Sequence, residues 1–219
     1  MALVTGFAPD PRRPGCFVVE VDRGRFTSLP LERLAGAGLS LAEGTALEPR
    51  QLTLLQALAD AESAWLAARR SLALRAHAQA DLRRKLTGKG HPPAAIADAV
   101  DRLAAQGLLD DSAFAETYAR TRVARGRGPS RLVHDLLRQG VDRGLAERSV
   151  AQAVADEGID PQVAARALAE KRARELEDVP PKARFRRVVG YLARRGFEGR
   201  EVREMVGQVL QGPPAMGRG

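Results

Sequence analysis

The sequence is poor in cysteine and aromatic residues and contains no long hydrophobic run. Cys16 is the only cysteine among 219 residues, so the chain cannot form an internal disulfide or a cysteine-based zinc site. Aromatic residues make up 4% of the chain, which argues against a large β-sandwich and against a protein that stacks single-stranded bases on surface rings. No apolar run approaches the roughly 18 residues of a membrane helix, and the first ten residues lack a secretory signal pattern. We therefore expect a cytoplasmic protein.

Lysine is also scarce, although the chain is strongly basic. It has 35 basic and 27 acidic residues, a formal net charge of +8, and only four lysines, so the other 31 basic residues are arginines. A GC-rich genome is one explanation of the arginine excess. The other is a polyanionic partner, because phosphates attract a positively charged surface at long range. Residues 1–60 carry a net charge of −1, which leaves +9 on the rest and predicts two different parts.

The first part, residues 1–50, has a mixed pattern. Phe17–Val21 is a short β-prone run, residues 22–25 form a turn signal, and residues 26–29 can return as a second strand. We expect a short β-hairpin followed by a short helix. At the other end of the chain, residues 211–219 are rich in glycine and proline, which predicts a flexible tail.

From Leu52 onward the pattern is helical and repeats three times. Gly90, Gly140 and Gly196 each follow an apolar helical stripe, with a leucine four residues before the glycine. Self-similarity at a period of about 50 residues indicates a helical repeat array. Each glycine is expected to supply the left-handed residue that ends a helix. The predicted three-helix repeats cover residues 52–105, 107–157 and 160–210.

The segment between the first two repeats is the most specific stretch of the sequence. Residues 107–118 read GLLDDSAFAETY, and the pattern continues through Arg122, Gly126, Gly128 and Pro129 to the sequence around Gly140. This stretch resembles the core signature of the RecX family, the bacterial regulators of the RecA recombinase. Residues 81–90 and 191–197 resemble the first and third repeats of that family. The resemblance covers residues 52–210, and residues 1–50 match poorly.

Two positions depart from the family's pattern. Ala78 and Gln79 stand where the family often has serine or threonine, so this helix start is expected to lack its side-chain cap, at a cost of ~1 kcal/mol. Gln139 stands where a lysine is common. The second departure leaves the strength of basic contacts in the middle repeat open.

The resemblance implies a mainly all-α fold in which three tandem three-helix repeats form an elongated, curved array behind the hairpin-containing segment. It also implies a regulatory protein rather than an enzyme. Proteins of this family bind the RecA–DNA filament and inhibit its ATPase, strand exchange and growth. The implied setting is DNA repair, recombination and the SOS response. The expected protein is a monomer without a cofactor.

Signatures of catalysis and metal binding are absent from the sequence. Gly88-Lys89 lacks the remainder of a phosphate-binding loop, and no Gly-x-Ser-x-Gly motif occurs. The three histidines lie in different repeats without the spacing of metal ligands. Asp110 and Asp111 precede an apolar helical run, so one of them is predicted to cap the helix and both to favour its positive N-terminal dipole, rather than to bind a metal. We therefore predict no catalytic residue, metal or cofactor.

Basic charge recurs on the middle helix of each repeat. Residues 81–89, 128–139 and 182–195 carry net charges of +3, +1 and +6. The last helix of each repeat is slightly acidic, which argues against a helix-turn-helix protein that places this helix in the major groove. If the repeats stack with a regular rotation, the middle helices form one basic stripe. An ordinary solvated face is the alternative.

The candidate DNA- and filament-binding residues are the basic residues on and beside these middle helices. They are Arg83, Arg84, Lys85, Lys89, Arg122, Arg125, Arg127, Arg131, Arg186, Arg187, Arg194 and Arg195. The predicted partners are a RecA-type filament and the phosphates of single- or double-stranded DNA. Two alternatives remain at this point. The chain could bind DNA alone without sequence preference, or it could be a protein scaffold for an acidic partner.

Overall fold

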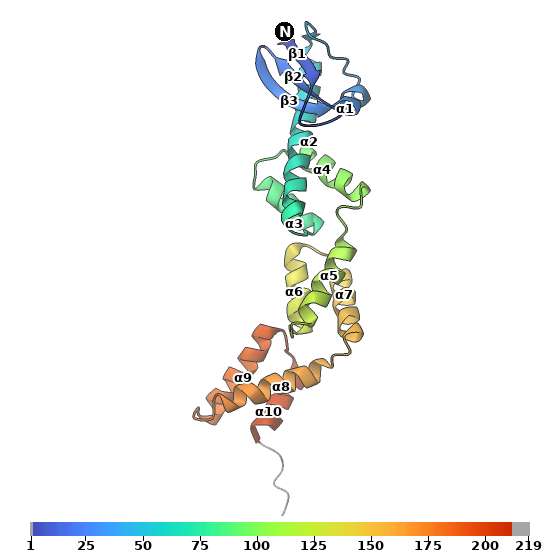
Figure 1. Ribbon diagram of the computed structural model, residues 1–219. Helices are drawn as coiled ribbons and strands as arrows, with labels where there is room; N and C mark the ends of the chain where they lie inside the picture. Colours follow the sequence, from blue (N-terminus) through green and yellow to red (C-terminus); the bar gives the residue numbers. More distant parts are fainter. Residues whose placement is uncertain (1, 212–219) are drawn as a thin grey trace, which may run out of the picture. The chain divides into compact units, whose positions relative to one another are not determined.

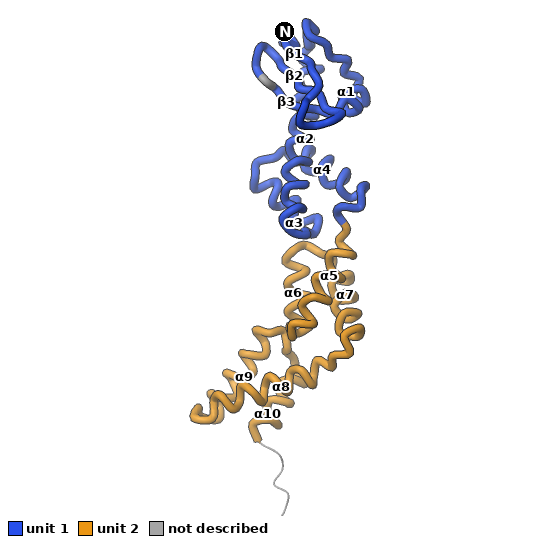
Figure 2. Tube along the Cα trace, in the orientation of Figure 1, with its two compact units in different colours: residues 1–109 blue, residues 110–219 orange. Residues whose placement is uncertain are grey.

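The structure of the protein is a computed structural model that describes residues 2–211, except for the side chain of Arg25. The chain divides into two compact units, residues 1–109 and 110–219 (Figure 2). Most of the predicted tail, residues 212–219, lies outside the described residues, whereas Gln211 ends the last helix. Among residues 2–211, no helix combines the length and apolar character needed to cross a membrane.

Unit 1 begins with a four-stranded antiparallel sheet in the order β3-β2-β1-β4 (Figure 1). The strands are β1 (Ala2–Pro9), β2 (Cys16–Val21), β3 (Gly24–Pro30) and β4 (Ala46–Leu47). β2 and β3 form the predicted hairpin, and helix α1 (Leu31–Gly36) is the predicted short helix. Asp22 and Arg23 both have positive φ, which suits the tight turn of a hairpin.

The sequence did not predict β1 and β4. β1 pairs with β2 along most of its length, but the register shifts between Val4 and Gly6. Such a bulge interrupts the strict alternation by which a strand is recognised in a sequence. β4 has only two residues and is defined entirely by its pairing with β1. The N-terminal segment is therefore a small sheet rather than a hairpin alone.

The remaining chain contains three three-helix repeats, as predicted (Figure 1). Repeat 1 consists of α2 (Pro49–Leu74), α3 (Gln79–Thr87) and α4 (Pro93–Ala105). Repeat 2 consists of α5 (Asp111–Val123), α6 (Pro129–Gln139) and α7 (Arg143–Asp156). Repeat 3 consists of α8 (Pro161–Arg174), α9 (Pro181–Arg195) and α10 (Arg200–Gln211).

The core of each repeat combines small residues of its first helix with leucines of its second. The buried alanines of the first helices include Ala64, Ala68, Ala115, Ala119, Ala165 and Ala169. Each of these pairs is spaced four residues apart, so the two alanines lie on one helix face. The buried leucines of the second helices include Leu82, Leu86, Leu132, Leu136 and Leu192. The small alanine side chains allow the neighbouring helices to approach closely.

The predicted glycine turns are confirmed. Gly90, Gly140 and Gly196 have φ of +83°, +87° and +90°. In each turn, the residue that follows the glycine donates its backbone N–H to the carbonyl of a leucine. That leucine stands four residues before the glycine. The donor–acceptor pairs are His91 to Leu86 (3.3 Å), Val141 to Leu136 (3.1 Å) and Phe197 to Leu192 (3.0 Å). This hydrogen bond satisfies a carbonyl that a helix end would otherwise leave unpaired.

The predicted caps are also confirmed. The Asp110 carboxylate accepts hydrogen bonds from the backbone N–H groups of Ser112 (2.7 Å) and Ala113 (3.2 Å), and so begins α5. Ala78 precedes α3 without a side-chain cap, as the departure from the family's pattern predicted.

α2 belongs both to the sheet and to repeat 1. Near its start, Leu55 packs with Val4 and Leu47 of the sheet, whereas its later turns join the core of repeat 1. Glu62, buried in the middle of α2, pairs with Arg13 from the loop after β1 and with Arg102 of α4. The N-terminal sheet and repeat 1 therefore form a single folded unit.

His77, buried between α2 and α3, should make the stability of unit 1 depend on pH. Its Nδ1 lies 2.7 Å from the Asp81 carboxylate, which Arg75 also contacts. Burial lowers the pKa of His77, and the nearby charges of Arg75 and Lys85 also lower it, although the Asp81 carboxylate opposes this shift. Below pH ~6.5 the unfolded chain takes up a proton more readily than the folded protein, so stability should fall as pH falls through this window.

Urea unfolding at about pH 7.5 and 5.5 tests this prediction. His77→Gln should flatten the pH dependence of the free energy of unfolding. His91→Gln makes the same substitution in the turn at Gly90 and should leave that dependence unchanged. An equally steep dependence in His77→Gln would assign the pH effect to another group.

Candidate polyanion-binding surface

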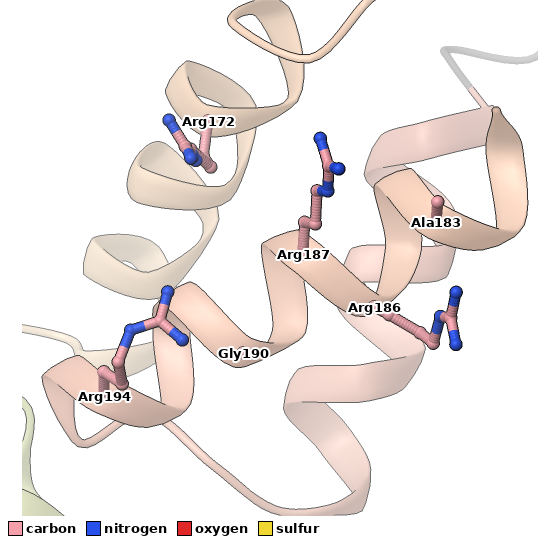
Figure 3. A pocket seen from close by; sticks show the side chains of 6 residues that line it. All are labelled: Arg172, Ala183, Arg186, Arg187, Gly190 and Arg194. Atoms are coloured by element: carbon pink, nitrogen blue, oxygen red, sulfur yellow. The ribbon is translucent and has the colours of Figure 1, made fainter. Parts of the chain in front are cut away.

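α9 carries the most concentrated positive charge of the described chain. It contains six basic residues and no acidic residue. Arg186, Arg187 and Arg194 are exposed, and none of the three has an ion-pair or hydrogen-bond partner among residues 2–211. Together with Arg172 of α8 they line a hollow of about 470 Å³ (Figure 3). The three guanidinium groups of α9 that lack carboxylate partners are suited to binding an anion.

Arg172 is held differently from its neighbours. One of its terminal nitrogens lies 2.6 Å from the Glu175 carboxylate, and its guanidinium lies 5.6 Å from the ring centre of Tyr191. Its Nε–H group is buried and has no hydrogen-bond partner among the described residues. Arg195 contacts the same ring at 4.9 Å. Tyr191 therefore fixes two arginines through cation–π contacts.

A second hollow, of about 480 Å³, lies between repeats 2 and 3 and also contains Arg194. Its other basic residues are Arg125 and Arg127 from the loop after α5, Arg131 of α6, and Arg195 of α9. We call the two hollows, lined by Arg125, Arg127, Arg131, Arg172, Arg186, Arg187, Arg194 and Arg195, the arginine surface. The structure thus gathers seven of the candidate residues and adds Arg172.

A contact between two glycines brings these segments together. The N–H of Gly128, at the start of α6, donates to the carbonyl of Arg195 at the end of α9, with an N···O distance of 2.7 Å. A Cβ atom at Gly196 would lie 2.4 Å from the Cβ of Arg131, and one at Gly128 would lie 2.4 Å from the carbonyl oxygen of Gly196. Only residues without side chains allow this approach, and it places Arg131 beside Arg195.

Asp135 compensates part of the charge in the second hollow. Its buried carboxylate lies 3.3 Å from Arg127 and 3.1 Å from Arg131. Arg122, the remaining candidate of repeat 2, stacks 3.5 Å from the ring centre of Tyr118. Burial raises the pKa of Tyr118, and its hydrogen bond to Asp135 acts in the same direction, although Arg122 opposes them. These contacts orient Arg122, Arg127 and Arg131.

The four candidates of repeat 1 lie in unit 1, on and just after α3. Arg83 and Lys89 are exposed, and Lys85 is half-buried. Arg84 lies 3.5 Å from the Asp81 carboxylate, which lowers its net contribution to the positive surface. The arginine surface belongs to unit 2 alone, so one basic stripe along all three repeats stays a prediction.

Sequence reasoning missed Arg172 and Gly190, which also line the first hollow. Arg172 lies in the basic run of residues 171–174, but α8 is the first helix of its repeat and was not counted with the middle helices. The charge count included Arg184, whose guanidinium instead donates to the carbonyl of Ala173 near the end of α8. Among residues 2–211, possible metal ligands do not gather in groups of three or more.

Comparison with known proteins identifies the same three repeats, in the same order, as the helices do. Family models match the first three-helix domain of RecX at residues 64–103, the second at residues 110–150 and the third at residues 160–206. Two crystal structures share the fold. One, of regulatory protein RecX, has a TM-score of 0.72 at 22% identity and covers 94% of this chain and 99% of that one. The other, RecX from Lactobacillus salivarius, has a TM-score of 0.56 at 22% identity and covers 69% and 97%.

Curated relatives are closer in sequence. The regulatory protein RecX of Halorhodospira halophila (strain DSM 244 / SL1) is 40% identical over 87 residues, which cover 40% of this chain and 54% of that protein. The regulatory protein RecX of Pseudomonas entomophila (strain L48) is 34% identical over 141 residues, which cover 64% of this chain and 85% of that protein. With all three repeats matched in order, the chain belongs to the RecX family of regulatory proteins.

Proposed function

We propose that the protein binds the filament that a RecA-type recombinase forms on DNA and inhibits the filament's ATPase, strand exchange and growth. It would thereby modulate DNA repair, recombination and the SOS response, without a catalytic step or cofactor of its own. Membership of a family of regulatory proteins supports this proposal. The observation that carries it is the group of uncompensated arginines in repeat 3, which suits the phosphates of a nucleoprotein filament.

The proposed mechanism is selective binding. Exposed arginines without internal carboxylate partners lose no ion pair when a phosphate approaches, so their charge is fully available for attraction and orientation. Binding inhibits the ATPase only if the protein binds the inactive state of the filament more tightly than the active state. Contacts with the recombinase itself would provide that difference, because DNA phosphates alone do not distinguish the two states.

The test is an ATPase titration with the recombinase from the same organism on single-stranded DNA. The wild-type protein should lower the rate of ATP hydrolysis. The double variant Arg186→Glu/Arg187→Glu should require at least about tenfold more protein for the same inhibition, because it replaces two attractive charges with repulsive ones. Arg143→Glu/Arg148→Glu makes the same change in charge on α7 and should inhibit like the wild type.

The same titration separates the alternative functions. A DNA-binding protein that acts alone would bind DNA with a strong salt dependence, with a Kd of roughly 10⁻⁴ to 10⁻⁶ M, and leave the ATPase unchanged at protein concentrations that do not saturate the DNA. A scaffold for an acidic partner would affect neither DNA nor the ATPase. Equal inhibition by both double variants would contradict a role for the arginines of α9.

A further inference from the structure

We propose that the groove around Gly190 on α9 binds the phosphodiester backbone of DNA, and that the missing side chain at Gly190 allows the phosphates to reach Arg187 and Arg194. The groove is the first hollow of the arginine surface, lined by α9 and by Arg172 of α8 (Figure 3). This inference states where on the protein the DNA of the proposed function is bound. It rests on that function for the identification of the DNA as that of a recombinase filament.

Three positions of α9 form one line along its surface. Arg187, Gly190 and Arg194 are separated by three and four residues, which places them on the same helix face. The two arginines are therefore about 10 Å apart along the helix axis. Figure 3 shows Gly190 between them, with no side chain to separate the two guanidinium groups. The bare backbone of α9 is the floor of the groove at this point.

Packing within the protein does not require a glycine at position 190. A Cβ atom there would have Arg194 Nη1 as its nearest neighbour, at an ordinary contact distance of 3.5 Å, and the backbone is not in the left-handed region. A glycine inside a helix destabilises the helix relative to alanine. Gly190 therefore destabilises α9, although neither packing nor backbone conformation requires a glycine there, in contrast to Gly196. Close approach of a ligand to the helix backbone would explain it.

The charges around this position are available for a ligand. Arg186, Arg187 and Arg194 have no ion-pair or hydrogen-bond partner among the described residues. The buried Nε–H of Arg172 also lacks an acceptor in that part of the chain. Guanidinium groups bind phosphates through paired N–H···O bonds, so several neighbouring phosphates can be held along this face.

The lining of the groove favours a nucleic acid over an acidic protein segment. Its only uncharged residues are Ala183 and Gly190, which offer no pocket for the aromatic or aliphatic anchors that dominate protein interfaces. A different hollow is lined by Val189, Phe197 and Val202 beside charged residues such as Glu198 and Arg200, and it offers the apolar contacts that the groove lacks. The groove thus matches a ligand that is recognised by its charged backbone.

The test compares two glutamine substitutions on the same helix. Gly190→Gln fills the groove with a neutral side chain, whereas Ala193→Gln adds the same side chain at an exposed position that lines the apolar hollow. Binding is measured by fluorescence anisotropy with a labelled oligothymidylate of about 20 nucleotides and with a duplex of the same length, without recombinase. Gly190→Gln should bind either probe about tenfold more weakly at ~100 mM salt, and Ala193→Gln within about twofold of the wild type.

Gly190→Ala provides a second variant in which stability and binding should change in opposite directions. The thermal midpoint should rise by about 2–4 °C, because alanine stabilises the interior of a helix relative to glycine. Affinity for DNA should fall, although less than in Gly190→Gln, because the methyl group only partly fills the groove. A variant that is merely less well folded would lose both stability and affinity.

Three results would overturn the inference. One is wild-type affinity for DNA in Gly190→Gln. Another is wild-type affinity in Gly190→Ala, should the glutamine variant fail to fold. The third is equally effective competition by polyglutamate at the same concentration of charges, which would assign the groove to an acidic protein segment. Since these assays contain no recombinase, an unchanged ATPase in the wild-type titration would contradict the proposed function alone.

Discussion

Replacing Gly196 with alanine should destabilise unit 2 by about 2–5 kcal/mol. Two costs combine at this residue. Its φ of +90° strains any residue with a side chain, and the added Cβ would lie 2.4 Å from the Cβ of Arg131 and 2.6 Å from the carbonyl oxygen of Gly128. Neither neighbour is the flexible end of a side chain, so backbone must move. Urea unfolding monitored by circular dichroism measures the loss.

Two matched variants separate the costs. Gly90→Ala in unit 1 has a similar backbone conformation, with φ of +83° and nothing within 4 Å of the new Cβ, so it should lose only about 1–2 kcal/mol. Gly128→Ala has an ordinary φ of −70° but would place its Cβ 2.4 Å from the Gly196 carbonyl oxygen, so it isolates the close contact. If all three variants lost the same stability, the contact between repeats 2 and 3 would not be a source of stability.

The double variant Arg13→Met/Arg102→Met should destabilise unit 1 by about 3 kcal/mol. Both arginines contact the carboxylate of Glu62, whose side chain is 2% exposed, whereas their own side chains are 23% and 22% exposed. Removing both leaves a buried negative charge without a cation, and this costs far more than losing an exposed ion pair. Thermal and urea unfolding measure the change.

Arg12→Met, an exposed neighbour in the same loop, is the control and should change stability by less than about 0.5 kcal/mol. Each single variant leaves Glu62 with one partner, so the two single losses should add up to less than the loss in the double variant. Strict additivity would indicate that the arginines stabilise the fold independently of Glu62. The pairing joins the loop after β1 to α4 and so connects the sheet to repeat 1.

Features encoded in neighbouring residues were predictable from the sequence. The helices of the repeats follow from apolar residues spaced three and four apart, and their ends follow from Gly90, Gly140, Gly196 and the Asp110 cap. The strands β1 and β4 were not predictable, because a bulge interrupts the alternation of one and the other exists only through its partner. Strand pairing is a long-range property that local patterns do not contain.

The candidate site likewise has features that the sequence predicted and features that it could not predict. Counting charges identified α9 and the loop after α5, because arginines and the absence of acidic residues are visible in the sequence itself. It could not distinguish Arg127, which Asp135 compensates, from Arg187, which has no partner among the described residues. That difference depends on which carboxylate the fold brings within reach of each guanidinium group.

The sequence by itself therefore determined the three three-helix repeats, the glycine turns within them and the basic character of their middle helices. Each of these depends on hydrogen bonds and side-chain periodicity within a few residues. Only the tertiary structure decided that Gly128 meets Gly196, that Arg172 joins the arginines of α9, and that Gly190 lies open between two of them. Those relations join residues far apart in the chain or depend on the rotamers and neighbours of long side chains, and they exist only once the repeats have packed.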